Sequence, residues 1–146
     1  MILNSISYQY LSNISMVIVP NIPDEHHVYM RVHKQNIDFK ETNPNRMIRP
    51  VAFDAKGEGG LSVDWSEYSS VKESLARAKV PESNGIISMP ILGIRANPLP
   101  LKVIHKPEDT NYSHCEIFGI PPKKPSDLGV RIKLMDLSKW EIICNE

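Results

Sequence analysis

Proline interrupts this chain more often than any other structure-breaking residue: twelve of its 146 residues are proline, against seven glycines. Proline lacks a backbone N–H and disfavours helical conformation in the residue before it, so the regular elements between prolines must be short. Several of those segments alternate apolar and polar residues, the period of a strand with one buried face. The sequence therefore predicts a fold built mainly from short strands.

The first strand is predicted at residues 27–33, where Val28, Met30 and Val32 alternate with polar side chains. Residues 34–50 are polar and contain two prolines, which is typical of a long loop. Similar short apolar or alternating segments recur after residue 60. They predict strands at 61–63, 85–89, 91–95, 101–105, 114–118, 130–134 and 140–144.

One principal helix is predicted at about residues 65–79. Asp64 is a suitable N-cap, and Pro81 follows the last helical position. The side chains expected on its apolar face are Tyr68, Val71, Leu75 and Ala78. Together these elements indicate an α+β fold, with one helix inserted into a mainly antiparallel sheet. An open sheet and a partial barrel both remain as alternatives.

Composition indicates an ordinary globular protein, with 41% hydrophobic and 23% charged residues. Residues 21–146 are expected to form a single domain, and residues 1–20 a loosely packed extension. No apolar run approaches the roughly 20 residues that a membrane span needs. The two cysteines, Cys115 and Cys144, form no metal-type pair and are too few for a secreted disulfide framework. A cytoplasmic protein with reduced thiols, and without membrane association, is the expectation.

The charges balance, with 17 basic and 17 acidic residues. Proteins dedicated to duplex DNA usually carry a basic excess, because phosphate contacts supply much of their affinity. Nucleic acid is therefore an unlikely partner, although Lys123 and Lys124 leave a local basic patch as an alternative.

Two histidines suggest a reactive site near the loop at 106–113. If strands 101–105 and 114–118 form a hairpin with His105 opposite His114, then Glu116 lies on the same face as both. Two imidazoles and a carboxylate can act as general acid, general base and electrostatic partner near neutral pH. A metal site would need further ligands, so no metal and no cofactor are expected. The alternative is a structural role, in which both histidines are hydrogen-bonded at strand ends.

The segment 49–65 and the first strand supply candidate substrate-binding residues. Arg31 and Arg49 are candidate phosphate ligands, and Asp54, Asp64 and Trp65 are the other candidates. The glycines at 57–60 do not form a phosphate-binding loop, because a strand follows them and no Lys-Ser or Lys-Thr pair closes the run. A tight turn between elements explains these glycines better.

Arg31, Ser62 and Glu116 occur on an early, a middle and a late predicted strand. This order resembles that of ADP-ribosyltransferases of the Arg–Ser–Glu type. The resemblance implies that the arginine holds a cofactor phosphate, the serine orders the site and the glutamate polarises the ribose. The usual Ser-Thr-Ser signature is absent, since residues 61–64 are Leu-Ser-Val-Asp.

A broader resemblance covers about residues 24–120. The chain is similar to a group of small uncharacterised bacterial proteins that share an Ala-Phe step, a Leu-Ser-Val-Asp-Trp segment and a late His-containing strand. The segments that carry the resemblance are 27–31, 49–53, 61–65, 103–105 and 113–119. It implies a bacterial-type, single-domain protein and assigns no activity.

Two functions follow as expectations. The first is a non-catalytic binding or accessory protein that acts through a protein partner, for example by strand addition at a sheet edge. The alternative is a small enzyme acting on a phosphoester or nucleotide, either a hydrolase or ADP-ribosyltransferase-like. In the enzyme, the chemical groups would be His105, His114 and Glu116, with Arg31 and Arg49 binding phosphate.

Overall fold

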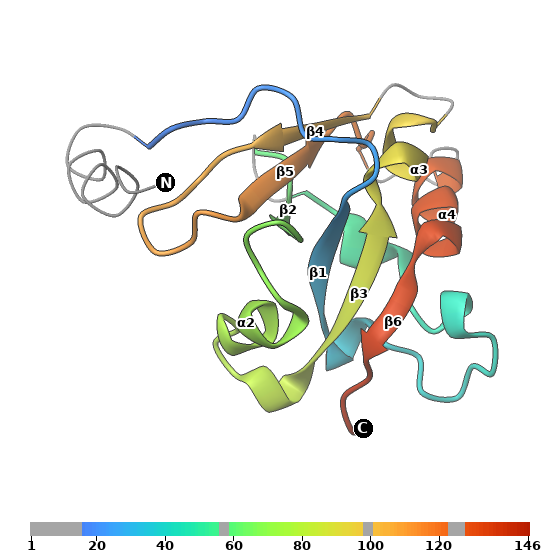
Figure 1. Ribbon diagram of the computed structural model, residues 1–146. Coiled ribbons are helices and arrows are strands. Elements are labelled where there is room, and N and C mark those ends of the chain that lie inside the picture. Colours follow the sequence, from blue (N-terminus) through green and yellow to red (C-terminus); the bar gives the residue numbers. More distant parts are fainter. Residues whose placement is uncertain (1–15, 56–58, 98–100, 123–127) are drawn as a thin grey trace.

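Six antiparallel strands form one open sheet in the computed structural model, which describes residues 16–55, 59–97, 101–122 and 128–146 (Figure 1). The strands are β1 (His27–His33), β2 (Leu61–Trp65), β3 (Asn84–Pro90), β4 (Lys102–His105), β5 (His114–Phe118) and β6 (Lys139–Ile142). Their order across the sheet is β4-β5-β2-β1-β3-β6. The predicted α+β class is confirmed, and the sheet does not close into a barrel.

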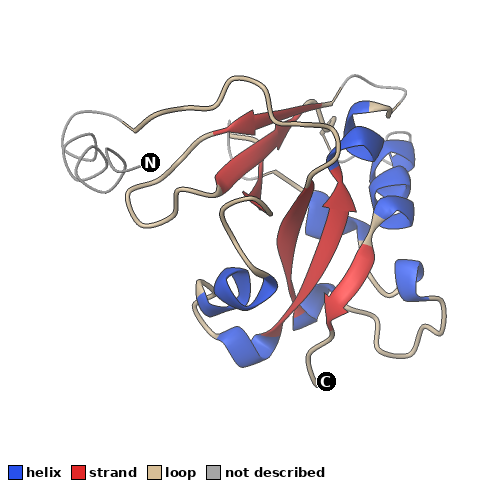
Figure 2. Ribbon diagram, viewed as in Figure 1, coloured by secondary structure: helices blue, strands red, loops and turns tan. Residues whose placement is uncertain are grey.

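The helices are short, and they pack on both faces of the sheet. Within the described residues, the α-helices are α2 (Val71–Ala76), α3 (Ile91–Arg95) and α4 (Leu128–Leu137). The 3-10 helices there are η1 (Lys34–Asn36), η2 (Pro44–Arg46), η3 (Pro50–Phe53) and η4 (Pro81–Ser83). Helices α3 and α4 lie next to each other, away from α2 (Figure 2). No helix in the described ranges has the length and apolar character needed to cross a bilayer.

The core lies on the face of the sheet that α4 and η3 cover. As the alternation predicted, Val28, Met30 and Val32 of β1 are all buried. They belong to one apolar cluster that includes Phe53 of η3 and Leu134 of α4. The opposite face carries the polar positions of the same strands. Helix α2 packs there, and Arg31 of β1 donates to the backbone oxygen of Ser74 in α2. The candidate site lies at the gap between β1 and β2, where residues from both faces of the sheet line it.

Two predicted strands are helices instead. The segment 130–134 lies within α4, where Val130 and Leu134 are buried and Ile132 is partly exposed. The segment 91–95 is α3. In both, the buried residues are three or four positions apart, which is helical spacing. Short apolar runs fit either period, and here the packing against the core decides in favour of helix.

The predicted helix at 65–79 begins too early. Asp64 is not a cap: it lies within β2, and the helix α2 starts only after Ser70. The Ser70 hydroxyl accepts from the N–H of Glu73, and the Glu73 carboxylate accepts from the N–H of Ser70, which is a capping box. Of the predicted apolar face, Val71 and Leu75 are half-buried within α2, whereas Tyr68 lies before the helix and is 44% exposed. The fully buried residue of α2 is Ser74.

The cysteines are free thiols. Burial raises the pKa of the Cys115 thiol to about 12, and the nearby Asp64 carboxylate acts in the same direction. Because the thiolate is the reactive form, Cys115 is an inert core residue.

Two earlier expectations fall mostly or wholly outside the described residues. Residues 1–15 of the expected N-terminal extension are not described, whereas Val19 is tied to β4 by a hydrogen bond from its N–H to Nδ1 of His105. The basic pair Lys123 and Lys124 also lies outside the described ranges.

The sheet divides between β1 and β2. These strands are paired only at Val28–Trp65 and Tyr29–Asp64. Beyond Tyr29, β1 continues in register with β3, whereas the first half of β2 is paired with β5. The two halves of the sheet therefore diverge next to Arg31 and Ser62, and this divergence positions the candidate site.

Candidate functional site

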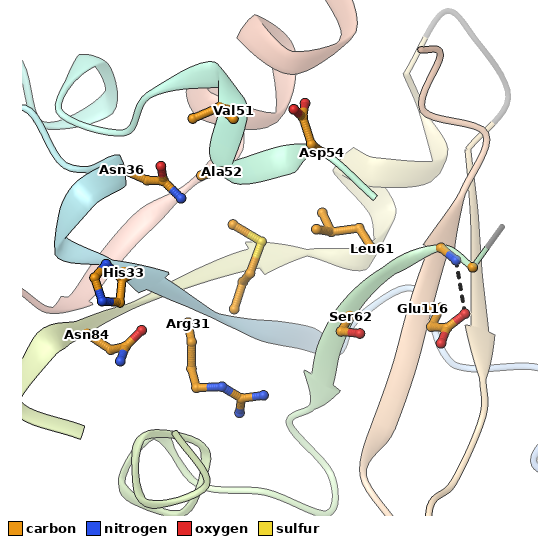
Figure 3. Close-up of a pocket in the computed structure, with 13 residues that line it drawn as sticks. Arg31, His33, Asn36, Val51, Ala52, Asp54, Leu61, Ser62, Asn84 and Glu116 are labelled. Carbon is orange, nitrogen blue, oxygen red and sulfur yellow. Dashed lines mark hydrogen bonds between the residues drawn. The ribbon is translucent and has the colours of Figure 1, made fainter. Parts of the chain in front are cut away.

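A cleft of about 480 Å³ lies where β1 and β2 diverge (Figure 3). Its volume is within the range of small-molecule sites in proteins, roughly 300–1,000 Å³. Its apolar wall comes from Met30, Val51, Ala52 and Leu61. The polar side chains that line it are Arg31, His33, Asn36, Asp54, Ser62, Asn84 and Glu116. They come from β1, η1, β2, β3 and β5 and from the end of η3, so residues distant in the sequence meet at this point.

Arg31 belongs to a charge network under the cleft. Asp64 is only 2% exposed, and its Oδ2 accepts from Nη1 of Arg31 at 3.3 Å and from Nη1 of Arg77 at 3.1 Å. Its Oδ1 accepts from the side-chain amide of Asn111 at 2.8 Å. One carboxylate thus serves two guanidinium groups, which leaves a net positive charge on the network. Nε and Nη2 of Arg31 have no partner among the described residues, so they are free to bind an anion.

Ser62 and His114 form a hydrogen-bonded pair at the cleft. His114 Nδ1 lies 2.8 Å from the backbone oxygen of Lys106, and a carbonyl can only accept, so the neutral ring carries its proton on Nδ1. Nε2 is then an acceptor, and it lies 3.3 Å from Oγ of Ser62. A hydroxyl next to an imidazole that a third group orients is the arrangement of an activated nucleophile and its general base.

Glu116 completes this side of the cleft. Its Oε1 accepts from the N–H of Gly60 at 3.0 Å (Figure 3). Oε1 also accepts from Nζ of Lys106 at 3.2 Å, and Oε2 lies 3.9 Å from Nε2 of His114. Burial by itself would raise the pKa of Glu116, but the bonds from Gly60 and Lys106 outweigh it and hold the pKa below its ordinary value. Glu116 is therefore a carboxylate at neutral pH, fixed beside the imidazole.

The register of the hairpin corrects the prediction for His105. His105 is opposite Cys115, and Ile104 is opposite Glu116, one residue away from the expected pairing. This shift sends His105 to the other face of the sheet from His114 and Glu116. Burial lowers the pKa of His105, so the ring is neutral at pH 7. Its two nitrogens contact the N–H of Val19 and the backbone oxygen of Tyr112, which makes its role structural.

The other predicted site residues divide into two groups. Asp54 lines the cleft, and its Oδ1 accepts from Nε of the buried Arg131 at 2.9 Å. Arg49 is exposed and does not line the cleft. Trp65 is buried on the core face, where its Nε1 donates to Nδ1 of His26. Asp64 lies in the network beneath Arg31 and not in the cleft wall. The structure thus brings together Arg31, Asp54 and Glu116, with His114 behind Ser62.

Sequence reasoning did not select Asn36 and Asn84 at all. Asn36 lies in η1, just after β1, and Asn84 is the first residue of β3. Polar residues are common at strand ends, so their positions in the sequence are only a weak signal for a binding site. The Ser62–His114 contact was also missed. Ser62 and His114 are 52 positions apart, and only the pairing of β2 with β5 brings them together.

The described residues contain no group of three or more His, Cys, Asp or Glu side chains placed to hold a metal ion. Comparisons of the chain with family models, with curated proteins and with solved structures found no match. The residues of the cleft therefore provide the basis for a functional assignment.

Proposed function

We propose that the protein is a small enzyme that cleaves a phosphoester bound in the cleft. The observation that carries this proposal is the Ser62–His114 pair, with the histidine tautomer oriented by Lys106, next to a cleft wall that contains Arg31. The pair supplies a nucleophile and its base. The positive network around Arg31 supplies a site for phosphoryl oxygens.

The reaction uses each group in turn. Oγ of Ser62 attacks phosphorus and its proton moves to Nε2 of His114, while the bond from phosphorus to the leaving oxygen breaks. The imidazolium gives that proton to the leaving oxygen. Water then attacks the phosphoryl-serine, again with His114 as base, and the released Ser62 recovers its proton. The carboxylate of Glu116 stabilises the imidazolium in both halves, and Arg31 stabilises the charge on the phosphoryl oxygens.

The contact between Ser62 and His114 favours hydrolysis over ADP-ribosyl transfer. In the transfer reaction the serine would only order the site, and it would need no general base. The hydrolase therefore accounts for more of the cleft: it gives separate roles to Arg31, Ser62, His114 and Glu116.

The direct test uses a chromogenic phosphodiester, bis(para-nitrophenyl) phosphate, at neutral pH. We expect the wild-type protein to release nitrophenol and Ser62→Ala to lose that activity, because alanine has no nucleophilic oxygen. Ser83→Ala is the matched control, since Ser83 lies in η4 and does not line the cleft. A Ser62→Ala protein with the wild-type rate, or a wild-type protein inactive on mono- and diesters alike, would refute the assignment.

A second candidate function is the binding of a partner protein at the edge of β6. Among the described strands β6 is paired only with β3, so the backbone groups of its outer edge have no strand partner. The opposite edge strand, β4, is flanked by the segment 16–19 (Figure 1). Two hydrogen bonds hold this segment: the N–H of Val19 donates to Nδ1 of His105, and the Tyr112 hydroxyl donates to the backbone oxygen of Val17. Ile143, just beyond β6, is 49% exposed and provides an apolar anchor for strand addition by an extended segment.

Photo-crosslinking distinguishes this second candidate. A photoreactive amino acid at position 143 should crosslink to one partner protein in cells. The crosslinked peptide should come from an extended segment of that partner. The same amino acid at position 132 is the control, because Ile132 is also partly exposed but lies on α4. Identical products from both positions, or none from position 143, would contradict partner binding at β6.

A further inference from the structure

A second hollow of about 270 Å³ adjoins the cleft. It lies between the end of β1 and the segment that follows α2, where Ala78, Lys79 and Val80 line it. Arg31, His33 and Asn84 line both spaces. We call the larger space the main cleft and the smaller one the side hollow. Because they share three wall residues, the two spaces lie side by side with Arg31 between them, and we call them together the groove.

The charges along this groove are unequal. The middle carries Arg31, whose network with Asp64 and Arg77 has a net positive charge. Lys79 adds a second cation on the side hollow, which has no carboxylate in its wall. The carboxylates in the wall of the main cleft are those of Asp54 and Glu116, and each is paired with a cation, Arg131 and Lys106 respectively. An anion is therefore favoured at Arg31, where two nitrogens of the guanidinium have no partner among the described residues.

The two ends of the groove suit uncharged groups. In the main cleft, the Asn36 side chain points into the space beside Val51 and Ala52 (Figure 3). Among the described residues its amide has no hydrogen-bond partner, so its donor and acceptor are both available. An amide next to a small apolar wall fits the edge of a planar heterocycle such as a nucleobase. In the side hollow, Ala78 and Val80 offer an apolar surface for a second group.

We propose that the substrate is bipartite: a nucleoside joined through a phosphodiester or pyrophosphate to a second group. The anionic linkage binds at Arg31, the nucleoside lies in the main cleft and the second group lies in the side hollow. This inference rests on the proposed phosphoesterase function, which it extends by naming the substrate class. Cleavage by Ser62 would then separate the two halves of the substrate.

The test compares two probes, AMP and diadenosine diphosphate, by isothermal titration calorimetry. The Ser62→Ala protein is used so that neither probe is turned over. We expect diadenosine diphosphate to bind at least tenfold more tightly than AMP, because its second nucleoside gains contacts in the side hollow. Ala78→Trp fills the side hollow and should remove this advantage. It should change the affinity for AMP by less than about twofold, because AMP does not reach the side hollow.

Ala52→Trp is the matched variant for the main cleft and should weaken both probes. Ala78→Met fills the side hollow with less bulk and replaces Ala78→Trp if circular dichroism shows that the latter is unfolded. Equal affinity of the two probes for the Ser62→Ala protein, or an advantage that survives both Ala78 variants, overturns the bipartite substrate. If the wild-type protein still hydrolyses bis(para-nitrophenyl) phosphate in that case, the proposed function stands without this extension.

Discussion

Replacing Asp64 with alanine is expected to destabilise the protein by roughly 3 kcal/mol, at the lower end of the range for breaking a buried ion pair. The carboxylate is 2% exposed and accepts hydrogen bonds from Arg31, Arg77 and Asn111. Its removal leaves two guanidinium groups without their shared counter-charge. The lower end of the range applies because the two arginine side chains are 31% and 26% exposed and so partly rehydrate.

Urea unfolding measures this effect as a lower midpoint concentration of urea, with no change in the slope of the unfolding free energy against urea concentration. Asp136→Ala is the control, because Asp136 also pairs with an arginine, Arg46, at 2.7 Å. Asp136 is 55% exposed, and an ion pair at such a surface contributes only about 0–1 kcal/mol. Equal losses of stability in the two variants would mean that the network under the cleft is not a buried one.

Asp64 also illustrates where sequence reasoning reaches its limit. Its position before a helical pattern suggested an N-cap, and Ser70 with Glu73 offered the better capping-box spacing a few residues later. The decisive partners of Asp64 are 13, 33 and 47 positions away in the sequence. No local pattern encodes them, because they meet only when β1, β2, α2 and the loop before β5 are packed together.

The strand alternation was a more dependable guide than the helical pattern. Val28, Met30 and Val32 are buried as predicted, and the same alternation placed Arg31 on the opposite face of β1. From there Arg31 lines the cleft together with Asp54 and Glu116. The segment 130–134 shows the opposite case. Its apolar residues fit a strand and a helix equally well, and only its packing against η3 and β3 makes it helical.

The hairpin of β4 and β5 shows why half of the predicted histidine site was wrong. The loop 106–113 contains its own pairing between Glu108 and Asn111, and Lys106 donates its N–H to the backbone oxygen of His114. This places His105 opposite Cys115. The turn geometry sets the register, and a shift of one residue moved His105 to the core while His114 and Glu116 stayed at the cleft.

The largest functional effect is expected at His114. His114→Asn should lower the rate of phosphodiester cleavage by about 10²–10⁴-fold, the usual contribution of general acid–base catalysis. The amide cannot take the proton from Oγ of Ser62, which His114 accepts through Nε2 at 3.3 Å. Initial rates of nitrophenol release, with protein folding checked by thermal unfolding, provide the measurement.

A double-variant cycle separates this role from a structural one. If His114 acts only by activating Ser62, then Ser62→Ala combined with His114→Asn should be no slower than either single variant, because groups that act as a unit are not additive. His27→Asn is the matched control, since His27 is an exposed residue at the start of β1 and does not line the cleft. Independent, multiplicative losses in the double variant would instead assign His114 to a step that does not pass through the Ser62 hydroxyl, for example binding of the phosphate.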